Sequence, residues 1–174
     1  MERKERVPHA NETRLSFAFV VSTGPDPYFQ MNDQVNVVCP HCNTTNRVPR
    51  ARLADGPTCG ACKQLLFNGH PFELTRATFD RQVASNELPL VVDFWAPWCG
   101  PCLSMAPAYE QAAAQLSPQV RLAKLNTEVE QDIASRFAIR GIPTLIAFKG
   151  GREVARQSGA MNLSTLVAWV KANV

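Results

Sequence analysis

The sequence has no long uninterrupted apolar segment. No stretch of its 174 residues approaches the roughly 18 apolar residues that a membrane-spanning helix requires. Residues 15–21 resemble the apolar part of a signal peptide, but acidic residues precede them and no small-residue cleavage site follows. We therefore expect neither a membrane segment nor an export signal.

A strong charge of either sign is also missing. The chain has 18 Lys and Arg against 15 Asp and Glu, for a net charge of +3, which gives no electrostatic case for a nucleic acid or a membrane surface as partner. Arg47, Arg50 and Arg52 form one basic stretch, but no aromatic residues alternate with them, as a nucleic-acid-binding ribbon would require. We expect a solvated loop there.

Isolated cysteines are the third absence. All six cysteines fall into C-x-x-C pairs, which a secreted disulfide scaffold would not normally show. Zinc ligands and catalytic dithiols are spaced in this way, and both favour a reducing compartment. We therefore expect a cytoplasmic protein. The pairs are Cys39/Cys42, Cys59/Cys62 and Cys99/Cys102.

The length allows one ordinary domain and a small module. Residues 1–34 have no useful periodicity and contain the breaker Gly24-Pro25-Asp26-Pro27, so we expect a disordered N-terminal extension. Met31 stands just before the first segment with a folded pattern and is an alternative translation start. The expected division is completed by a small module at 35–72 and a larger domain at 73–174.

The first two cysteine pairs predict one zinc ion. Their pattern, C-x2-C-x16-C-x2-C, lies within the spacing of structural zinc sites with four cysteine ligands. Each pair forms a tight turn with both thiolates on one side, and we expect Gly60 to relieve crowding in the second turn. The module has few large apolar residues, so metal must supply folding free energy. The predicted ligands are Cys39, Cys42, Cys59 and Cys62.

Other interpretations of this module remain open. The two pairs could be redox pairs or free thiols instead of metal ligands. His70 follows Cys62 by eight residues and could replace one thiol, although four thiols already complete a tetrahedron. His41 is expected to face solvent.

Residues 73–174 have the pattern of an α/β domain. Apolar runs predict strands at 88–95, 120–125, 144–148 and 152–157, the last two joined by a hairpin at Gly150-Gly151. Helices are expected to begin after Thr75 and after Asn162, and a longer one is expected from Gly100 to Ser117 with Pro107 inside. Another helix is expected to begin at a capping box of Thr127 and Glu130, with Val129 facing inward. This order predicts a mixed sheet with helices on both faces.

The third cysteine pair predicts a redox site. Cys99 and Cys102 lie where a buried strand meets a helix, in Trp95-Ala-Pro-Trp-Cys-Gly-Pro-Cys102. The helix N-terminus favours a thiolate at Cys99, while Cys102, one turn further, is expected to be more buried. Cys99 would then attack a substrate disulfide and Cys102 would release the product. The alternatives are packed cysteines or half of a metal site.

Three residues elsewhere are candidates to support this chemistry. Asp93 lies in an apolar strand, so burial should raise its pKa and fit it to exchange a proton with Cys102, unless it reaches solvent at the strand end. Lys124, in another apolar run, is the expected neighbouring charge, with ordinary surface alternation as the alternative. Pro143 precedes a strand and is either an ordinary turn proline or a cis proline.

These residues together resemble the thioredoxin family. Val92 to Cys102 is similar to the active-site signature of that family, including the acid, both tryptophans and the Gly-Pro between the cysteines. Pro107, Lys124, Ile142-Pro143-Thr144, Gly151 and Gly159-Ala160 stand at matching spacings. The preceding two cysteine pairs resemble the zinc-binding bacterial thioredoxin-2 class. The fold implied is a three-layer thioredoxin-like domain preceded by a small zinc-ribbon-like module.

The resemblance also implies roles for particular residues. Cys99 is the nucleophile, Cys102 the resolving thiol, Asp93 the proton acceptor and Lys124 the charge that tunes it. Pro143 is cis, and the Ile142 backbone pairs with the substrate. Trp98, Gly141 and Gly159 border the docking surface, and Gly100 and Pro101 set the redox potential toward reduction of substrates.

The implied activity is that of a monomeric protein-disulfide reductase. Its partners would be oxidised proteins and an NADPH-dependent thioredoxin reductase as electron donor, with zinc as the one bound ion and no organic cofactor. One departure from the family is Leu103, where Lys or Arg usually follows the second cysteine. Two competing hypotheses are a zinc-dependent interaction module and a redox sensor that releases zinc when its thiols are oxidised.

Overall fold

The computed structural model describes residues 33–174. The signal-like segment, Met31 and nearly all of the expected disordered extension lie outside this range. The first strand, β1, begins at Gln34, one residue before the expected start of the small module. Among the residues described, no helix is long and apolar enough to cross a membrane.

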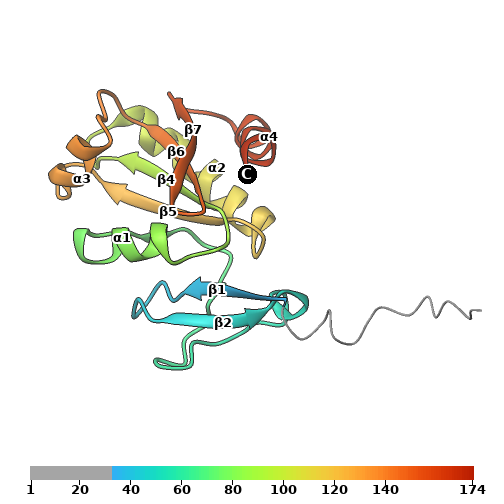
Figure 1. The fold of residues 1–174 in the computed structure, drawn as a ribbon. Helices are drawn as coiled ribbons and strands as arrows, with labels where there is room; N and C mark the ends of the chain where they lie inside the picture. The colour runs from blue at the N-terminus through green and yellow to red at the C-terminus, as the bar shows by residue number, and fades with distance from the viewer. Residues whose placement is uncertain (1–32) are drawn as a thin grey trace, which may run out of the picture.

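The small module is built on a two-stranded antiparallel sheet (Figure 1). It consists of β1 (Gln34–Val38), β2 (Thr45–Pro49) and a short 3-10 helix, η2 (Arg50–Arg52). The two cysteine turns follow β1 and η2. The buried cluster of the module includes Leu88 from the larger domain, so its core is shared between both parts of the chain.

A five-stranded sheet forms the centre of the larger domain, in the order β3-β5-β4-β6-β7. The strands are β3 (Phe72–Glu73), β4 (Leu90–Trp95), β5 (Arg121–Asn126), β6 (Thr144–Lys149) and β7 (Arg152–Ser158). β3, β5 and β4 are parallel, whereas β6 and β7 are antiparallel to their neighbours. This is the predicted mixed sheet.

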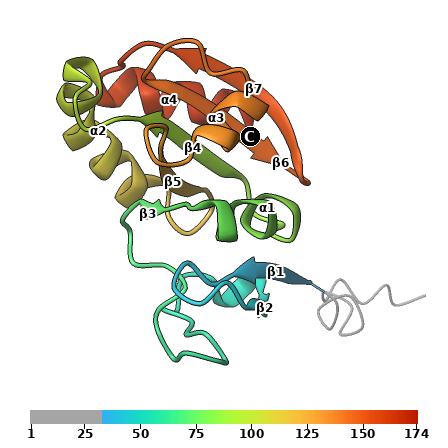
Figure 2. The same ribbon diagram turned by 90° about the vertical axis from the view of Figure 1, so that its left-hand side faces the viewer.

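Helices cover both faces and make three layers (Figures 1 and 2). They are α1 (Arg76–Ala84), α2 (Gly100–Leu116), α3 (Gln131–Arg136) and α4 (Leu163–Asn173). Val91 packs with α2 and α4, while the next residue, Val92, packs with α1 and α3. Because side chains alternate along a strand, Asp93 points to the face that α2 covers.

Two local predictions were wrong, and one strand was missed. Thr127 and Glu130 form no capping box, because Thr127 Oγ1 donates to the Trp95 carbonyl and the Glu130 carboxylate accepts from the Arg76 N–H. α3 therefore begins only after Glu130, and Val129, expected to face inward, is 70% exposed. β3 has two residues, too few to show a period in the sequence, and the expected boundary between 72 and 73 falls inside it.

The small module rests on the end of the sheet where β4 and β5 begin. Leu90 and Arg121, the first residues of these strands, are register partners. Arg121 Nη1 donates to the carbonyl of Val38, at the end of β1, and the Gln82 side chain of α1 donates to the Cys39 carbonyl. Figure 2 shows β1 and β2 beside α1. Cys99 and Cys102 follow β4, so they lie at the opposite end of the sheet from the small module.

Candidate functional site

Cys99 and Cys102 form a disulfide at the start of α2. Cys99 is the N-cap residue, and its Sγ lies 3.2 Å from the Cys102 backbone nitrogen, which donates to it. The helix therefore offers this sulfur both an N–H group and the positive end of its dipole, which stabilise a thiolate. Gly100 and Pro101 occupy the first two helical positions, where the missing N–H of proline removes no helical bond.

The expected difference in exposure between the two cysteines is very small in this disulfide form. Cys99 is 4% exposed and Cys102 is 3% exposed. The exposed neighbours are Trp98, at 69%, and Leu103, at 52%. The joined sulfurs are thus flanked by an apolar surface.

Three ionisable residues lie in a row across neighbouring strands of the sheet. Lys124 of β5 is the register partner of Asp93 in β4 and of Glu73 in β3, so all three side chains point to the same face. Asp93 is 2% exposed, and its Oδ1 has no hydrogen-bond partner among residues 33–174. The Lys124 Nζ lies 4.1 Å from the centre of the Trp95 ring.

Burial controls the ionisation of Asp93. Removal from water raises its pKa from 3.8 to about 7, because the charged form is poorly solvated. Lys124 acts against this rise, and the nearby Glu73 carboxylate adds to it. The pKa of Glu73 is itself raised by desolvation, with Lys124 again opposing. Asp93 can therefore accept or release a proton near neutral pH.

A turn at the start of β6 forms the next part of the site. The Ile142–Pro143 peptide bond is cis, as the resemblance implied. The Pro143 carbonyl accepts from the Gly159 N–H at 2.9 Å, and the Gly141 carbonyl accepts from Thr144 Oγ1 at 2.7 Å. Gly159 has a φ of +94°, a conformation that side chains rarely adopt. The predicted residues Gly141, Ile142 and Pro143 thus lie in one loop cluster with Gly159, which comes from a later segment.

A groove of about 370 Å³ is lined by Trp98 on one side and by Gly141 and Ile142 of the cis-proline loop. Residues of α3 and Arg140, which precedes Gly141, also line it. The predicted surface residues from the active-site turn and from the cis-proline loop therefore lie beside one another.

Tyr109 connects α2 with the strands under it. Its side chain is 1% exposed, and its hydroxyl lies 3.0 Å from the Val91 carbonyl and 2.9 Å from the Ala123 carbonyl. These carbonyls belong to β4 and β5, close to Asp93 and Lys124. Burial raises the pKa of Tyr109 well above 10, so the hydroxyl remains a donor.

The other four cysteines form a separate cluster in the small module. All four Sγ atoms lie within 4.8 Å of one another. The Cys39–Cys62 and Cys42–Cys59 sulfurs are each 3.6 Å apart. A tetrahedron with Zn–S bonds of about 2.3 Å has sulfurs roughly 3.8 Å apart, so the donor set fits zinc in number, type and spacing.

The two cysteine turns repeat one backbone design. His41 N–H donates to Cys39 Sγ and Ala61 N–H to Cys59 Sγ, each at 3.4 Å. The residue after each pair, Asn43 or Lys63, has a positive φ, of 61° and 64° respectively. Our expectation for Gly60 was wrong in its reason, because Gly60 has no positive φ and a Cβ there would make only an ordinary contact of 3.6 Å with Asn46 Oδ1.

The two histidines near this cluster are not part of it. His41 is exposed, as expected. His70 Nδ1 lies 3.6 Å from the Glu110 carboxylate on α2. The alternative in which His70 replaces a thiol therefore receives no support.

The fold and the paired cysteines define the thioredoxin class of α/β proteins. The Thioredoxin family model matches residues 70–172, and the model "Thioredoxin 2, N-terminal" matches residues 38–64. Thioredoxin C-3 of Corynebacterium nephridii is 42% identical over 77% of this chain and 92% of its own length. Thioredoxin 1 of Synechococcus elongatus is 46% identical over 53% of this chain and 87% of its own, and Pseudomonas aeruginosa thioredoxin is 38% identical over 60% and 97%.

The chain belongs to the thioredoxin family, with the N-terminal zinc ribbon of the thioredoxin-2 class. Members of this family are thiol-disulfide oxidoreductases, and this chain is one of them.

Sequence reasoning missed three residues of these sites. Glu73 lies in a strand too short to predict, and its place beside Lys124 depends on sheet order. Tyr109 lies inside the helix expected from Gly100 to Ser117, and a usable signal was that a buried tyrosine usually needs a hydrogen-bond partner. Arg121 lies in an apolar run, like Lys124, and could have been marked for the same reason.

Proposed function

We propose that the protein reduces disulfides of other proteins, with Cys99 as the attacking thiolate and Cys102 as the resolving thiol. The observation that carries this proposal is the N-cap position of Cys99, where the Cys102 N–H points at its sulfur. A thiolate is the reactive form of cysteine, and a helix N-terminus lowers the pKa of such a thiol.

The reaction has two exchange steps. The Cys99 thiolate attacks one sulfur of the substrate disulfide, so a mixed disulfide forms and the other substrate sulfur leaves as a thiolate. Cys102 then loses its proton and attacks Cys99 Sγ, which releases the second substrate thiol. The product is the Cys99–Cys102 disulfide that the structure contains.

Asp93 is the proposed acceptor of the Cys102 proton. Asp93 points to the face of the sheet that α2 covers, and α2 is the helix that carries Cys102. The pKa of Asp93, about 7, fits a general base near neutral pH. Lys124 limits the rise of this pKa, because its positive charge favours the carboxylate. A bridging water would complete the transfer if the two groups do not touch.

Substrates are proposed to bind over Trp98 and the cis-proline loop. The groove beside the disulfide is lined by Trp98, Gly141 and Ile142, and Gly159 bonds to the backbone of Pro143. An extended substrate segment would pair with the Ile142 backbone in the manner of an added strand. Gly100 and Pro101 set the potential through the first turn of the helix.

The proposed setting is the cytoplasm, with an NADPH-dependent thioredoxin reductase returning electrons to Cys102 and Cys99. Neither NADPH nor another organic cofactor is proposed to bind this chain, which would act as a monomer. Zinc would be held by Cys39, Cys42, Cys59 and Cys62 and would stabilise the small module.

Reduction of insulin disulfides tests the proposed function. With dithiothreitol or a reductase as electron source, Cys99→Ser is expected to fall to the uncatalysed rate while zinc remains bound. Cys59→Ser is the matched control, because it removes a thiol from the other cluster and should leave most turnover. Full activity of Cys99→Ser would refute the assignment.

Leu103→Lys is expected to alter partner preference before it alters the chemistry. Leu103 is 52% exposed beside the disulfide, so lysine would replace an apolar contact with a positive charge and leave the buried thiols in place. We expect a several-fold change in KM for one reductase with little change in kcat. The reason is that the substitution changes both the contact surface and the electrostatic field that a docking partner meets. Unchanged partner kinetics would contradict this prediction.

A redox response of the zinc cluster is a second proposed role. Cys42 is exposed, so one thiolate of the cluster is open to peroxide. Mild peroxide should then release zinc before the protein aggregates, and a dye for free zinc measures the release. Zinc retained until global unfolding would leave only the structural role.

A further inference from the structure

Arg121 is a buried cation without a carboxylate partner among residues 33–174. It is 4% exposed, and none of the six ion pairs in this part of the chain includes it. Its Nη1 donates to two neutral oxygens, the Val38 carbonyl and, at 3.2 Å, Gln82 Oε1. A buried charge without a compensating charge is costly.

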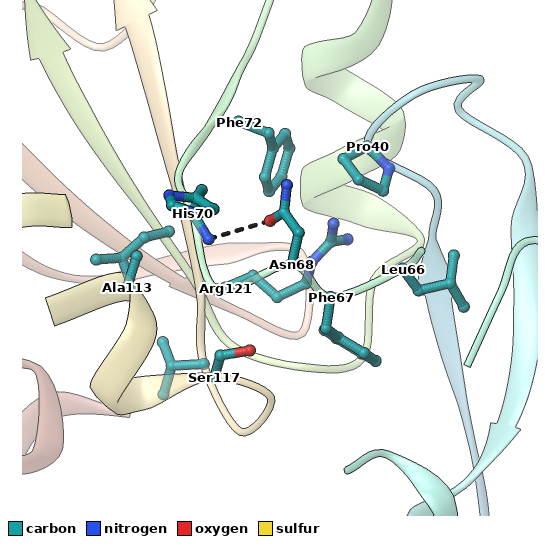
Figure 3. Close-up of a pocket in the computed structure, with 12 residues that line it drawn as sticks. Pro40, Leu66, Phe67, Asn68, His70, Phe72, Ala113, Ser117 and Arg121 are labelled. Atoms are coloured by element: carbon teal, nitrogen blue, oxygen red, sulfur yellow. Dashed lines mark hydrogen bonds between the residues drawn. The ribbon is translucent and has the colours of Figure 1, made fainter. Parts of the chain in front are cut away.

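Aromatic rings offset part of this cost. The guanidinium carbon lies 4.5 Å from the centre of the Phe72 ring and 5.9 Å from that of Phe67. Figure 3 shows Arg121 between these rings, beside a cavity of about 20 Å³, which has room for about one water and no organic ligand. Neutral rings alone do not supply the negative charge that a buried guanidinium normally faces.

The hydrogen-bond partners of Arg121 lead to the first cysteine turn. Val38, which accepts from Arg121, directly precedes Cys39. Gln82, its second partner, donates from Nε2 to the Cys39 carbonyl at 2.9 Å and to Asn43 Oδ1 at 3.3 Å. Arg121 and Gln82 thus hold the first cysteine turn against the larger domain.

We propose that Arg121 is the counter-charge of the zinc centre and makes metal affinity depend on docking of the two modules. This inference rests on the proposed zinc site. Four thiolates around one Zn²⁺ leave a net charge of minus two, and zinc binding requires deprotonated thiols. A guanidinium fixed behind the Cys39 turn stabilises that anionic cluster, while the cluster supplies the charge that Arg121 lacks.

The proposal predicts the effect of removing this charge. Partners behind a metal ligand typically change metal affinity about 10- to 100-fold when mutated. Arg121→Met keeps much of the apolar stem but removes the charge, so we expect zinc affinity to fall by about that factor. Arg121→Lys retains a positive charge and is expected to stay within about threefold of the wild type. By linkage, zinc should stabilise the Met variant against unfolding less than it stabilises the wild type.

The experiment is competition for zinc between the full-length protein and a chromogenic chelator, with the active-site disulfide kept oxidised. Arg81→Met is the matched control, because Arg81 Nη1 donates to the Asn43 carbonyl of the same turn at 3.3 Å but its side chain is exposed. Its affinity should remain within about threefold of the wild type. Arg121→Gln, neutral and able to donate a hydrogen bond, is the second variant should the Met protein fold poorly.

The outcomes separate the possible failures. Tight binding by wild type, Arg121→Lys and Arg81→Met, with weak binding by Arg121→Met and Arg121→Gln, supports the counter-charge role. Equal affinity in all five proteins overturns it and leaves the zinc site intact. Equal losses in the Lys, Met and Gln variants also overturn it, since they would show a packing role without need of charge. A wild-type protein that binds no zinc refutes the zinc site itself.

Discussion

Asp93→Asn is expected to stabilise the protein above pH 7 by roughly 4 kcal/mol, taking about 1.4 kcal/mol for each pKa unit. The pKa of Asp93 rises from 3.8 to about 7 on folding, so the native state holds a proton that the unfolded state has lost between these values. The free energy of unfolding of the wild type therefore falls as pH rises from about 4 to about 7, and it stays low above that range. Asparagine cannot ionise and escapes this loss.

Urea unfolding of both proteins at several pH values measures this effect. The two curves should differ little near pH 4 and separate progressively up to pH 7. Glu128→Gln is the control, because Glu128 is an exposed acid on the same domain and its removal should leave the pH dependence unchanged. If the Asp93→Asn protein has the same pH dependence as the wild type, then folding does not raise the pKa of Asp93, and this prediction is contradicted.

Cys59→Ser is expected to abolish zinc binding and unfold the small module, while the larger domain stays folded. Structural zinc contributes about 10–16 kcal/mol in small zinc-binding peptides, far more than the few apolar residues here can replace. The larger domain would lose the bonds from Arg121 and Gln82 to the first cysteine turn, at a cost of about 1–3 kcal/mol. Its own two core clusters on the faces of the sheet would remain.

Two signals separate the modules in this experiment. All three tryptophans, Trp95, Trp98 and Trp169, lie in the larger domain, so their fluorescence reports on that domain alone. Hydrogen exchange of β1 and β2 reports on the small module. Cys102→Ser is the matched control and should keep both zinc and protected strands. A single cooperative loss of both signals in Cys59→Ser would contradict independent folding of the larger domain.

Much of the site could be predicted because its residues lie close in sequence. The cysteine spacing, the helix start at Gly100 and the acid within an apolar strand are local patterns, and each predicted its own chemistry. The cis Pro143 loop required the resemblance, because a proline before a strand has several ordinary explanations. Its position beside Trp98 depends on strand order, which no local pattern contains.

The prediction failed where a distant contact decides the structure. Thr127 and Glu130 have the spacing of a capping box, but Trp95 and Arg76 provide competing hydrogen bonds from other elements. Glu73 and Lys124 meet only because β3 pairs with β5 instead of with β4. The junction of the modules, through Gln82 and Arg121, likewise joins segments about 40 and 80 residues apart in the chain.

Mixed-disulfide trapping tests the central assignment most directly. A labelled peptide disulfide is mixed with reduced Cys102→Ser or Cys99→Ser protein, and the site of attachment is identified by mass spectrometry. The assignment predicts a stable adduct at Cys99 in the Cys102→Ser protein, since no resolving thiol remains, and none in the Cys99→Ser protein. An adduct at Cys102 that forms as fast in Cys99→Ser would contradict it.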